Sequence, residues 1–294
     1  MSQPEFYLNG KFVLPTEASI PISDVGFIHG ATITEQLRTF GGHPFLLDQH
    51  IARLQTGLQT LEIDLSQLKP DFESLTREVC QRYLDSKGVK ECGIGIFCTP
   101  GTTSRFGGLQ QDHPTVCIYA YPLPIEEFAK HYRAGVDLVI AGNRDVSKSA
   151  WPKSIKARSR LHYYLADLEA RKSNGIPLLT SDAGFLRDTS TATPFYLFEK
   201  NEITLSPADE ILDSVSMNFL IELANACSIS VVRREIHRSE IDQLRATALV
   251  SSLFSLYTCR SIDGRKLETG HPEIQQLKTA WTRKAGYDFF VSNQ

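Results

Sequence analysis

The stretch ISDVGFIHGATITEQLRTFGGHPFLLDQHIARLQTGLQTLEI, residues 22–63, carries the clearest local pattern of the chain. Polar and apolar side chains alternate sufficiently over residues 32–40 for a half-buried strand, and Gly41-Gly42 then supplies a tight turn. From Asp48, a residue type that caps helix starts, apolar side chains recur at helical spacing. The stretch therefore predicts a strand, a turn and an amphipathic helix.

Further elements follow in a mixed order. The helices that we expect lie at about residues 66–88, 158–173, 214–228 and 272–286, and the strands at 92–98, 115–121, 136–141, 177–181 and 195–198. Leu161, Leu165 and Leu168 should lie on one side of the second of these helices, and Ser239 opens a segment that resembles a capping box. Because long, regular βαβ alternation is missing, the pattern favours an α+β fold.

The length of 294 residues suits two modest domains. The segment Tyr121-Pro-Leu-Pro124 holds two prolines in an extended setting where few contacts are expected to cross. We therefore predict an N-terminal domain over residues 1–123 and a C-terminal domain over residues 124–294.

Composition excludes several classes of function. The 31 Lys and Arg residues against 34 Asp and Glu give a net charge of −3, which disfavours nucleic acid as a partner. The sequence contains no apolar stretch near the ~18 residues of a membrane span and no signal-peptide pattern at its start, so we expect a cytoplasmic protein. The 6 cysteines form no C-x-x-C pair, and we therefore expect reduced core cysteines and no metal site.

Three features suggest a ligand that carries a phosphate group. Arg53 lies near a predicted helix start, Asp213-Ser-Val-Ser216 opens another helix, and Ser251-Ser252 follows a strand. Each feature alone is also compatible with an ordinary capped helix or strand end. Lys156 has Ile155 and Leu161 nearby in the sequence, which would desolvate its amine, although a solvated surface lysine fits the same residues.

The order of these pieces is more specific than any one of them. The chain matches the pattern N-G…D-x-G-F…E-x-x-R…G-x-x-x-x-L-x-x-H-x-x-R-L, and further matches follow in register up to residue 265. The pattern resembles the class IV aminotransferases, the fold-type IV pyridoxal-phosphate family of branched-chain aminotransferase, D-amino-acid aminotransferase and aminodeoxychorismate lyase. The resemblance implies a two-domain α+β enzyme with a small α/β domain, a larger mixed-barrel domain and pyridoxal 5′-phosphate as cofactor. The matching positions are Asn9, Gly10, Asp24, Gly26, Phe27, Glu35, Arg38, His50, Arg53, Leu54, Lys156, Asp188, Leu212, Val215, Ser216 and Ser252.

The resemblance implies a catalytic lysine and a phosphate site. Lys156 matches the lysine that forms a Schiff base with the cofactor and then moves the substrate proton. Arg53 matches the arginine that binds the cofactor phosphate. Val215 and Ser216 match the pair whose backbone N–H groups bind the same phosphate, and Ser252 matches a hydroxyl that completes the site.

It also implies contacts to the ring and to the substrate. Leu212 matches the residue packed on one face of the pyridine ring, and Asp188 stands where the family has a glutamate paired with the ring nitrogen. Arg105 matches an arginine that holds the substrate carboxylate in the D-amino-acid branch. Arg38 adds to the expectation of a carboxylate-bearing substrate, and Thr34 replaces an aromatic residue in the pocket wall.

The leading hypothesis is therefore an aminotransferase of branched-chain or D-amino-acid type, which moves an amino group between an amino acid and a 2-oxo acid. One alternative is a lyase that resembles aminodeoxychorismate lyase, and another is a non-catalytic relative that only binds the cofactor. By the same resemblance, we expect a homodimer.

Overall fold

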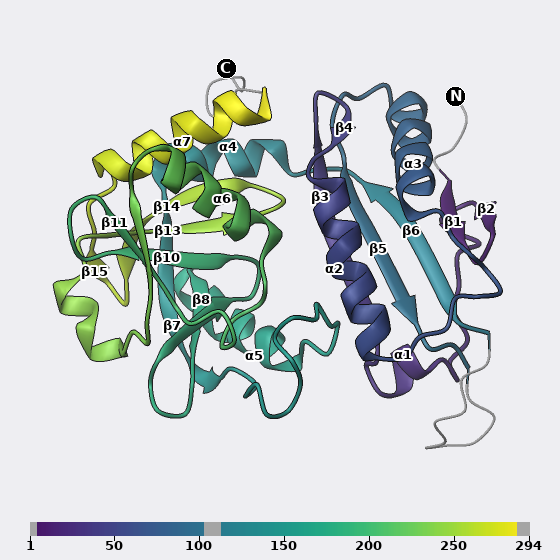
Figure 1. Ribbon diagram of the computed structural model, residues 1–294, viewed down its shortest axis with the longest axis horizontal. Helices are drawn as coiled ribbons and strands as arrows, with labels where there is room; N and C mark the ends of the chain where they lie inside the picture. Colours follow the sequence, from purple (N-terminus) through teal and green to yellow (C-terminus); the bar gives the residue numbers. More distant parts are fainter. Residues whose placement is uncertain (1–4, 103–112, 287–294) are drawn as a thin grey trace. The chain divides into compact units, whose positions relative to one another are not determined.

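The computed structural model describes residues 5–102 and 113–286, and the chain folds into two compact units (Figure 1). The first unit comprises Met1–Leu123 together with Ser154–Ser159. The second unit comprises Pro124–Lys153 and Arg160–Gln294. The chain thus changes units at the proline segment and crosses back once, for six residues around Lys156.

Within its described residues, the first unit is a six-stranded antiparallel sheet with helices. Its elements are β1 (Phe6–Leu8), β2 (Lys11–Val13), α1 (Val25–Ile28), β3 (Ile33–Phe40), β4 (His43–Pro44), α2 (Leu47–Thr60), α3 (Phe72–Lys87), β5 (Gly93–Thr99) and β6 (Thr115–Tyr121). The strands follow the order β2-β1-β6-β5-β3-β4. Helix α2 packs against β3 and α3 against β6, and the predicted strand, turn and helix of residues 22–63 are confirmed. Asp48 does not cap the helix, because α2 already begins at Leu47 and Asp48 lies in its first turn.

The two faces of β3 have different surroundings. Ile33 and Glu35 face α2, and the approach is so close that a Cβ atom on Gly57 would lie 2.6 Å from Cγ2 of Ile33. Because side chains alternate along a strand, Thr34 points to the opposite face, where it lies across from Phe97 of β5. The sheet therefore has one face buried under a helix and one face that carries Thr34 and Phe97.

Residues 154–159 join the first unit through β3. Ala157 forms an antiparallel bridge with Ile33, the Thr34 N–H donates to the Lys156 carbonyl at 2.9 Å, and the Arg158 N–H donates to the Thr32 carbonyl at 2.9 Å. These backbone bonds hold Lys156 on the first unit, whereas a single boundary at residue 123 would have assigned it to the second. The pairing is non-local, which explains why sequence periodicity gave no sign of it.

The described part of the second unit contains a mixed nine-stranded sheet. Its elements are α4 (Ile125–Ala134), β7 (Val136–Arg144), α5 (Leu161–Ala170), β8 (Ile176–Thr180), β9 (Leu186–Thr189), β10 (Thr193–Leu197), β11 (Glu202–Leu205), α6 (Val215–Ala226), β12 (Ser230–Arg233), β13 (Ala246–Ser251), β14 (Ser255–Ile262), β15 (Arg265–Lys266) and α7 (Pro272–Ala285), with 3₁₀ turns at Arg171–Ser173 and Arg238–Gln243. The order is β12-β11-β10-β13-β14-β7-β8-β9, and β15 pairs with β14.

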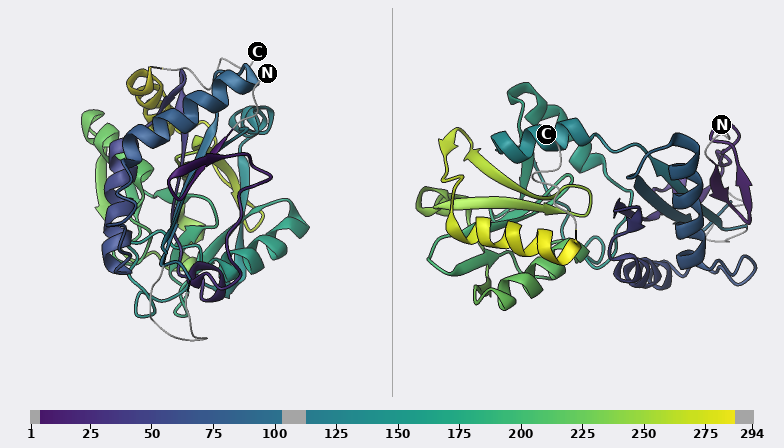
Figure 2. Two further views of the ribbon diagram at one scale, coloured as in Figure 1. Left: turned by 90° about the vertical axis from the view of Figure 1, so that its right-hand side faces the viewer. Right: turned by 90° about the horizontal axis from the view of Figure 1, so that it is seen from above.

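This sheet curls rather than lying flat. Strand β9 ends the hydrogen-bonded order, yet it also lies in contact with β10, which is near the other end. Helix α5 covers β7 and β8, while α6 packs against β13 and α7 against β14, as Figure 1 and Figure 2 show. The parallel pairing of β7 with both β8 and β14, amid antiparallel neighbours, fits the predicted mixed barrel.

Two local predictions need correction. Helix α3 begins at Phe72 rather than near Ser66, because Lys69 adopts a positive φ of 41° that interrupts a helix, and Asp71 then caps the start. The capping box begins at His237 rather than Ser239, since the Glu240 side chain accepts from the His237 backbone N–H at 2.8 Å.

Helix α5 also differs from expectation. It starts at Leu161, not at residue 158, and its buried residues are Ala166 and Ala170. Leu161, at 69% exposure, is one of a row of exposed side chains on this helix. Ile155, the other apolar neighbour that we expected beside Lys156, is buried. The exposed row consists of Leu161, Tyr164, Leu165 and Leu168.

Candidate active site

A buried ion-pair cluster joins β3 to α2 in the first unit. Glu35 accepts hydrogen bonds from Nε and Nη2 of Arg53 at 2.7 and 2.6 Å, and Nδ1 of His50 lies 2.7 Å from Oε2, the oxygen that also accepts from Nη2. Burial acts to raise the pKa of Glu35, but the charge and hydrogen bonds of Arg53 and His50 lower it to about 2. The carboxylate is therefore ionised and fixes the orientation of the Arg53 guanidinium.

Lys156 lies within electrostatic range of this cluster. Burial lowers the pKa of His50, and the charges of Arg53 and Lys156 add to that effect against the opposing pull of Glu35. The Lys156 side chain is half-buried, and its backbone is held by β3. The first unit thus positions both the predicted catalytic lysine and the predicted phosphate-binding arginine.

The other predicted substrate residues of this unit lie as follows. Thr34 is buried, and its hydroxyl donates to the Ile96 carbonyl at 2.9 Å. Arg38 is only 2% exposed, its Nε donates to the Thr39 carbonyl at 3.0 Å, and its guanidinium stacks on Phe40. This burial favours a structural role for Arg38 over contact with a substrate. Arg105 lies outside the described residues.

In the second unit, Asp188 on β9 is a buried carboxylate with one satisfied and one open oxygen. Its Oδ2 accepts the Leu212 N–H at 2.8 Å, whereas Oδ1 is buried without a hydrogen-bond partner among the residues that the structure describes. Burial raises the pKa of Asp188 to about 6, and the hydrogen bond from the Leu212 N–H acts in the opposite direction. An N–H donor that carries positive charge would satisfy Oδ1 and stabilise the ionised form.

The start of α6, the predicted phosphate site, lies close to Leu212 in sequence. Ser214 caps the helix by accepting the Met217 N–H at 3.2 Å, as the sequence predicts. The N–H groups of Val215 and Ser216 belong to the first helical turn, which leaves them available to a ligand. The Ser216 hydroxyl lies 2.7 Å from that of Ser252, so two hydroxyls and a helix N-terminus converge.

The residues of the second unit therefore fit pyridoxal phosphate. The open oxygen of Asp188 suits the protonated ring nitrogen, and the start of α6 with Ser252 suits the phosphate dianion. Leu212 connects the two, because it binds Asp188 through its N–H and precedes α6 by three residues.

Glu35 and His50 are the parts of this arrangement to which the sequence assigned no role. The signal was present, since His50 and Arg53 stand one helical turn apart on α2 and Glu35 lies on the strand that α2 covers. The spacing does not reveal that a single buried carboxylate contacts both.

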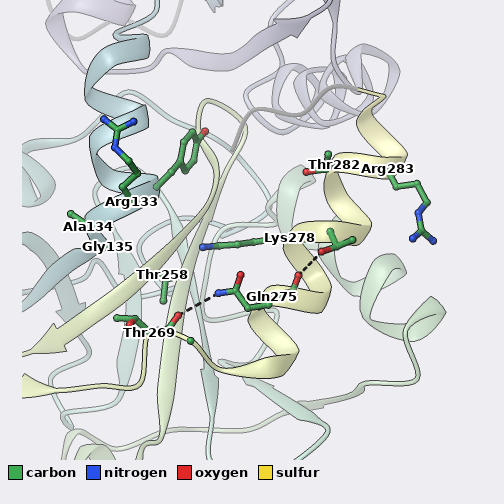
Figure 3. Close-up of a pocket in the computed structure, with 12 residues that line it drawn as sticks. Arg133, Ala134, Gly135, Thr258, Thr269, Gln275, Lys278, Thr282 and Arg283 are labelled. Atoms are coloured by element: carbon green, nitrogen blue, oxygen red, sulfur yellow. Dashed lines mark hydrogen bonds between the residues drawn. The ribbon is translucent and has the colours of Figure 1, made fainter. Parts of the chain in front are cut away.

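A separate hollow of about 600 Å³ lies between α4, β14 and α7, and none of the predicted site residues lines it (Figure 3). Its lining includes Arg133, Gln275, Lys278 and Arg283, and burial lowers the pKa of Lys278. Within residues 5–102 and 113–286, no cluster of His, Cys, Asp or Glu is suited to hold a metal ion. No helix in these ranges has the length and apolar character needed to cross a membrane.

Residues 32–262 match the sequence model of the family described as amino-transferase class IV. The chain belongs to this family. As a class IV aminotransferase, it is a pyridoxal-phosphate-dependent enzyme, which confirms the predicted family and cofactor.

Known relatives of this class IV aminotransferase have different activities. The chain is 23% identical to D-alanine aminotransferase of Bacillus licheniformis, with 90% of each chain covered. It is 26% identical to aminodeoxychorismate lyase of Bacillus subtilis over 74% of this chain and 73% of that protein. The solved structure of branched-chain aminotransferase from Thermoproteus uzoniensis with norvaline superimposes with a TM-score of 0.85 at 20% identity, covering 99% and 98% of the two chains. This likeness confirms the predicted fold.

Proposed function

We propose that this class IV enzyme transfers an amino group between an amino acid and a 2-oxo acid, as an aminotransferase of branched-chain or D-amino-acid type. The observation that carries the proposal is Asp188, whose buried Oδ1 has no hydrogen-bond partner among the described residues. Its Oδ2 accepts the N–H of Leu212, which leads into the proposed phosphate site at the start of α6. When bound, pyridoxal phosphate supplies an aldehyde that joins amines covalently and a ring that accepts electron density.

The phosphate of the cofactor has a defined set of partners in this proposal. The N–H groups of Val215 and Ser216 and the hydroxyls of Ser216 and Ser252 would bind its oxygens. Arg53 would add positive charge, and its orientation is already fixed by Glu35. Because Glu35 compensates that charge, we expect the serines and helix N-terminus to contribute much of the phosphate affinity.

Lys156 is the residue that we assign to proton transfer. Its Nζ would act as a general base that removes the proton from the substrate carbon bearing the amino group. It would then act as a general acid that returns the proton to the cofactor carbon bonded to the same nitrogen. Asp188 would keep the ring nitrogen protonated, and Leu212 would pack on the ring face. Thr34 and Arg105 remain proposals for contact with the substrate.

The proposal is tested by loading the protein with pyridoxal phosphate and screening L- and D-amino acids by absorbance. An aminotransferase converts the cofactor to its amine form with a simple amino acid, and a 2-oxo acid reverses the change. Failure of every amino acid to convert the bound cofactor would contradict the proposal.

A lyase is the second candidate, and the similarity to aminodeoxychorismate lyase over 73% of that protein favours it. A lyase would release pyruvate from its substrate but convert its cofactor slowly with simple amino acids. Pyruvate release measured beside the absorbance screen therefore separates the two activities.

We also propose that the enzyme is a homodimer in the cytoplasm. The row Leu161, Tyr164, Leu165 and Leu168 leaves α5 with an exposed apolar face, which suits contact with a second copy. Leu165→Glu should lower the mass measured by light scattering, whereas Val89→Glu, at an exposed apolar site of the first unit, should not. Imaging of a tagged protein tests the location.

A further inference from the structure

The segment that carries Lys156 places a second cation beside it. Residues 156 and 158 both make backbone bonds to β3, to Thr34 and Thr32, and they flank the bridge between Ala157 and Ile33. Side chains two residues apart in an extended segment lie on the same side, about 7 Å apart along the chain. Arg158 therefore lies next to Lys156 along this edge of the sheet, and its guanidinium lies on the face of Thr34.

The Arg158 guanidinium lies on this face against polar and aromatic groups. Its Nη2 donates to the Tyr119 hydroxyl at 2.8 Å, its Nε lies 3.4 Å from the Thr34 hydroxyl, and its Cζ lies 5.4 Å from the centre of the Phe97 ring. Tyr119 itself packs edge-on to Phe97, with ring centres 6.4 Å apart. These contacts position the guanidinium, while the Arg158 side chain stays exposed.

Arg158 differs from Arg53, Arg77 and Arg82 of the same unit, because it pairs with no carboxylate among the described residues. Arg53 pairs with Glu35, Arg77 with Glu73, and Arg82 with Glu78. The residues that the structure describes provide Arg158 with no such ion pair, and its hydrogen-bond partners are two neutral hydroxyls. A guanidinium has five N–H donors in a planar fork that matches a carboxylate, so Arg158 keeps donors for an acidic ligand.

We propose that Arg158 binds a carboxylate group of the substrate, with the Tyr119 hydroxyl as a second donor. This inference rests on the proposed function, because the reacting group would be held by Lys156, two residues away. Thr34 is important for the arrangement, since a small side chain leaves room for the guanidinium where a larger one would cover Phe97. The substrate class is thereby an amino acid or 2-oxo acid whose anionic end lies on this face.

Calorimetric binding of pyruvate and 2-oxoglutarate tests the proposal, with and without pyridoxal phosphate. Arg158→Gln should weaken binding by roughly 10- to 100-fold, and Arg158→Lys by less, because charge-assisted hydrogen bonds to a carboxylate are strong and two-pronged. Tyr119→Phe should weaken binding by a smaller factor. The control Arg77→Gln removes the same charge from an exposed arginine of the same unit and should leave both affinities unchanged.

The two acids distinguish which carboxylate is bound. Weakened binding of both identifies the carboxylate next to the reacting carbon, and weakened binding of 2-oxoglutarate alone identifies the second carboxylate; either result supports the proposal. In turnover, Arg158→Gln should raise KM more than it lowers kcat, and the absorbance of the bound cofactor should stay unchanged.

The measurements without cofactor separate this inference from the proposed function. A protein that fails to bind pyridoxal phosphate would refute the proposed function, yet its carboxylate affinity still reports on Arg158. Equal affinities for Arg158→Gln and the wild type, or no measurable binding of either acid to the wild type in either condition, would overturn the assignment of Arg158.

Discussion

The backbone N–H of Leu212 donates to Oδ2 of Asp188 at 2.8 Å, which leaves Oδ1 as a buried acceptor without a partner among the described residues. The bond connects the carboxylate to the segment that leads into α6, where the phosphate is expected to bind. Leu212 thus connects the predicted partner of the ring nitrogen to the predicted phosphate site.

Asp188 should make the stability of the cofactor-free protein depend on pH. Its folded pKa of about 6 lies above the ordinary 3.8, so folding favours the protonated form. The resulting stabilisation is complete below pH 3.8 and is lost as the pH rises through 6, by on the order of 3 kcal/mol. Urea unfolding across this range should show the wild type losing stability relative to Asp188→Asn. Parallel pH profiles for the two proteins would show that Asp188 is not the group whose ionisation changes the stability.

The cofactor should reverse this behaviour. A protonated ring nitrogen beside Oδ1 stabilises the ionised carboxylate, so the affinity for pyridoxal phosphate should increase as the pH rises through about 6. Asp188→Asn keeps the shape but cannot ionise, and its affinity should lack that increase. Fluorescence titration with pyridoxal phosphate at a series of pH values measures this affinity. An identical increase in Asp188→Asn would show that another group causes the pH dependence.

Ser216 and Ser252 should act on the phosphate rather than on the ring. Because their hydroxyls lie 2.7 Å apart, Ser216→Ala and Ser252→Ala should each weaken binding of pyridoxal phosphate by roughly tenfold. Pyridoxal without the phosphate is the matched control, and its affinity should be nearly the same in all three proteins. An equal loss for both ligands would place the serines elsewhere in the site.

Glu35 should be important for stability as well as for orienting Arg53. Glu35→Gln leaves a buried guanidinium without its counter-charge and should cost about 3–5 kcal/mol of unfolding free energy. In the wild type, this stabilisation is present above pH 4.5 and is lost as the pH falls through about 2, since the folded pKa is depressed. Glu73→Gln breaks the exposed pair with Arg77 and should change stability by less than about 1 kcal/mol. Equal losses of unfolding free energy in Glu35→Gln and Glu73→Gln would contradict a larger contribution from the buried pair than from the exposed one.

Gly57 should be required for the contact between α2 and β3. Alanine normally stabilises a helix by about 1 kcal/mol relative to glycine, but a Cβ atom here would lie 2.6 Å from Ile33. Gly57→Ala should therefore destabilise the protein by roughly 1–3 kcal/mol through overpacking. In an Ile33→Ala background the same change should become stabilising. A destabilisation that persists in this background would point to a different cause.

Sequence patterns predicted the helices and strands that are specified by residues within the same segment. The alternation before Gly41 and the helical spacing after Asp48 correspond to β3 and α2, because each pattern reflects burial against one neighbour. Ser214 likewise marks a helix start by accepting the Met217 N–H, and Pro272 marks another because its fixed φ suits the first helical position. The order of the motifs, rather than any single one, identified the family.

Non-local contacts could not be predicted in the same way. The pairing of residues 154–159 with β3 joins segments more than a hundred residues apart, and periodicity contains no information about it. The leucine spacing of α5 predicted an apolar stripe, yet the structure buries Ala166 and exposes Leu161. An apolar helix face has the same spacing of side chains whether it packs against the protein core or is exposed for contact with another chain. The open oxygen of Asp188 likewise depends on a three-dimensional arrangement.

The assignment of Lys156 is tested most directly by trapping the cofactor on the chain. The protein is mixed with pyridoxal phosphate, reduced with borohydride, digested and mapped by mass spectrometry, with Lys156→Ala and Lys153→Ala treated in parallel. The cofactor mass should appear on Lys156 in the wild type and in Lys153→Ala, and no stoichiometric label should remain in Lys156→Ala. Stoichiometric labelling of another lysine, or an adduct that survives in Lys156→Ala, would contradict the assignment of Lys156 as the residue that binds the cofactor.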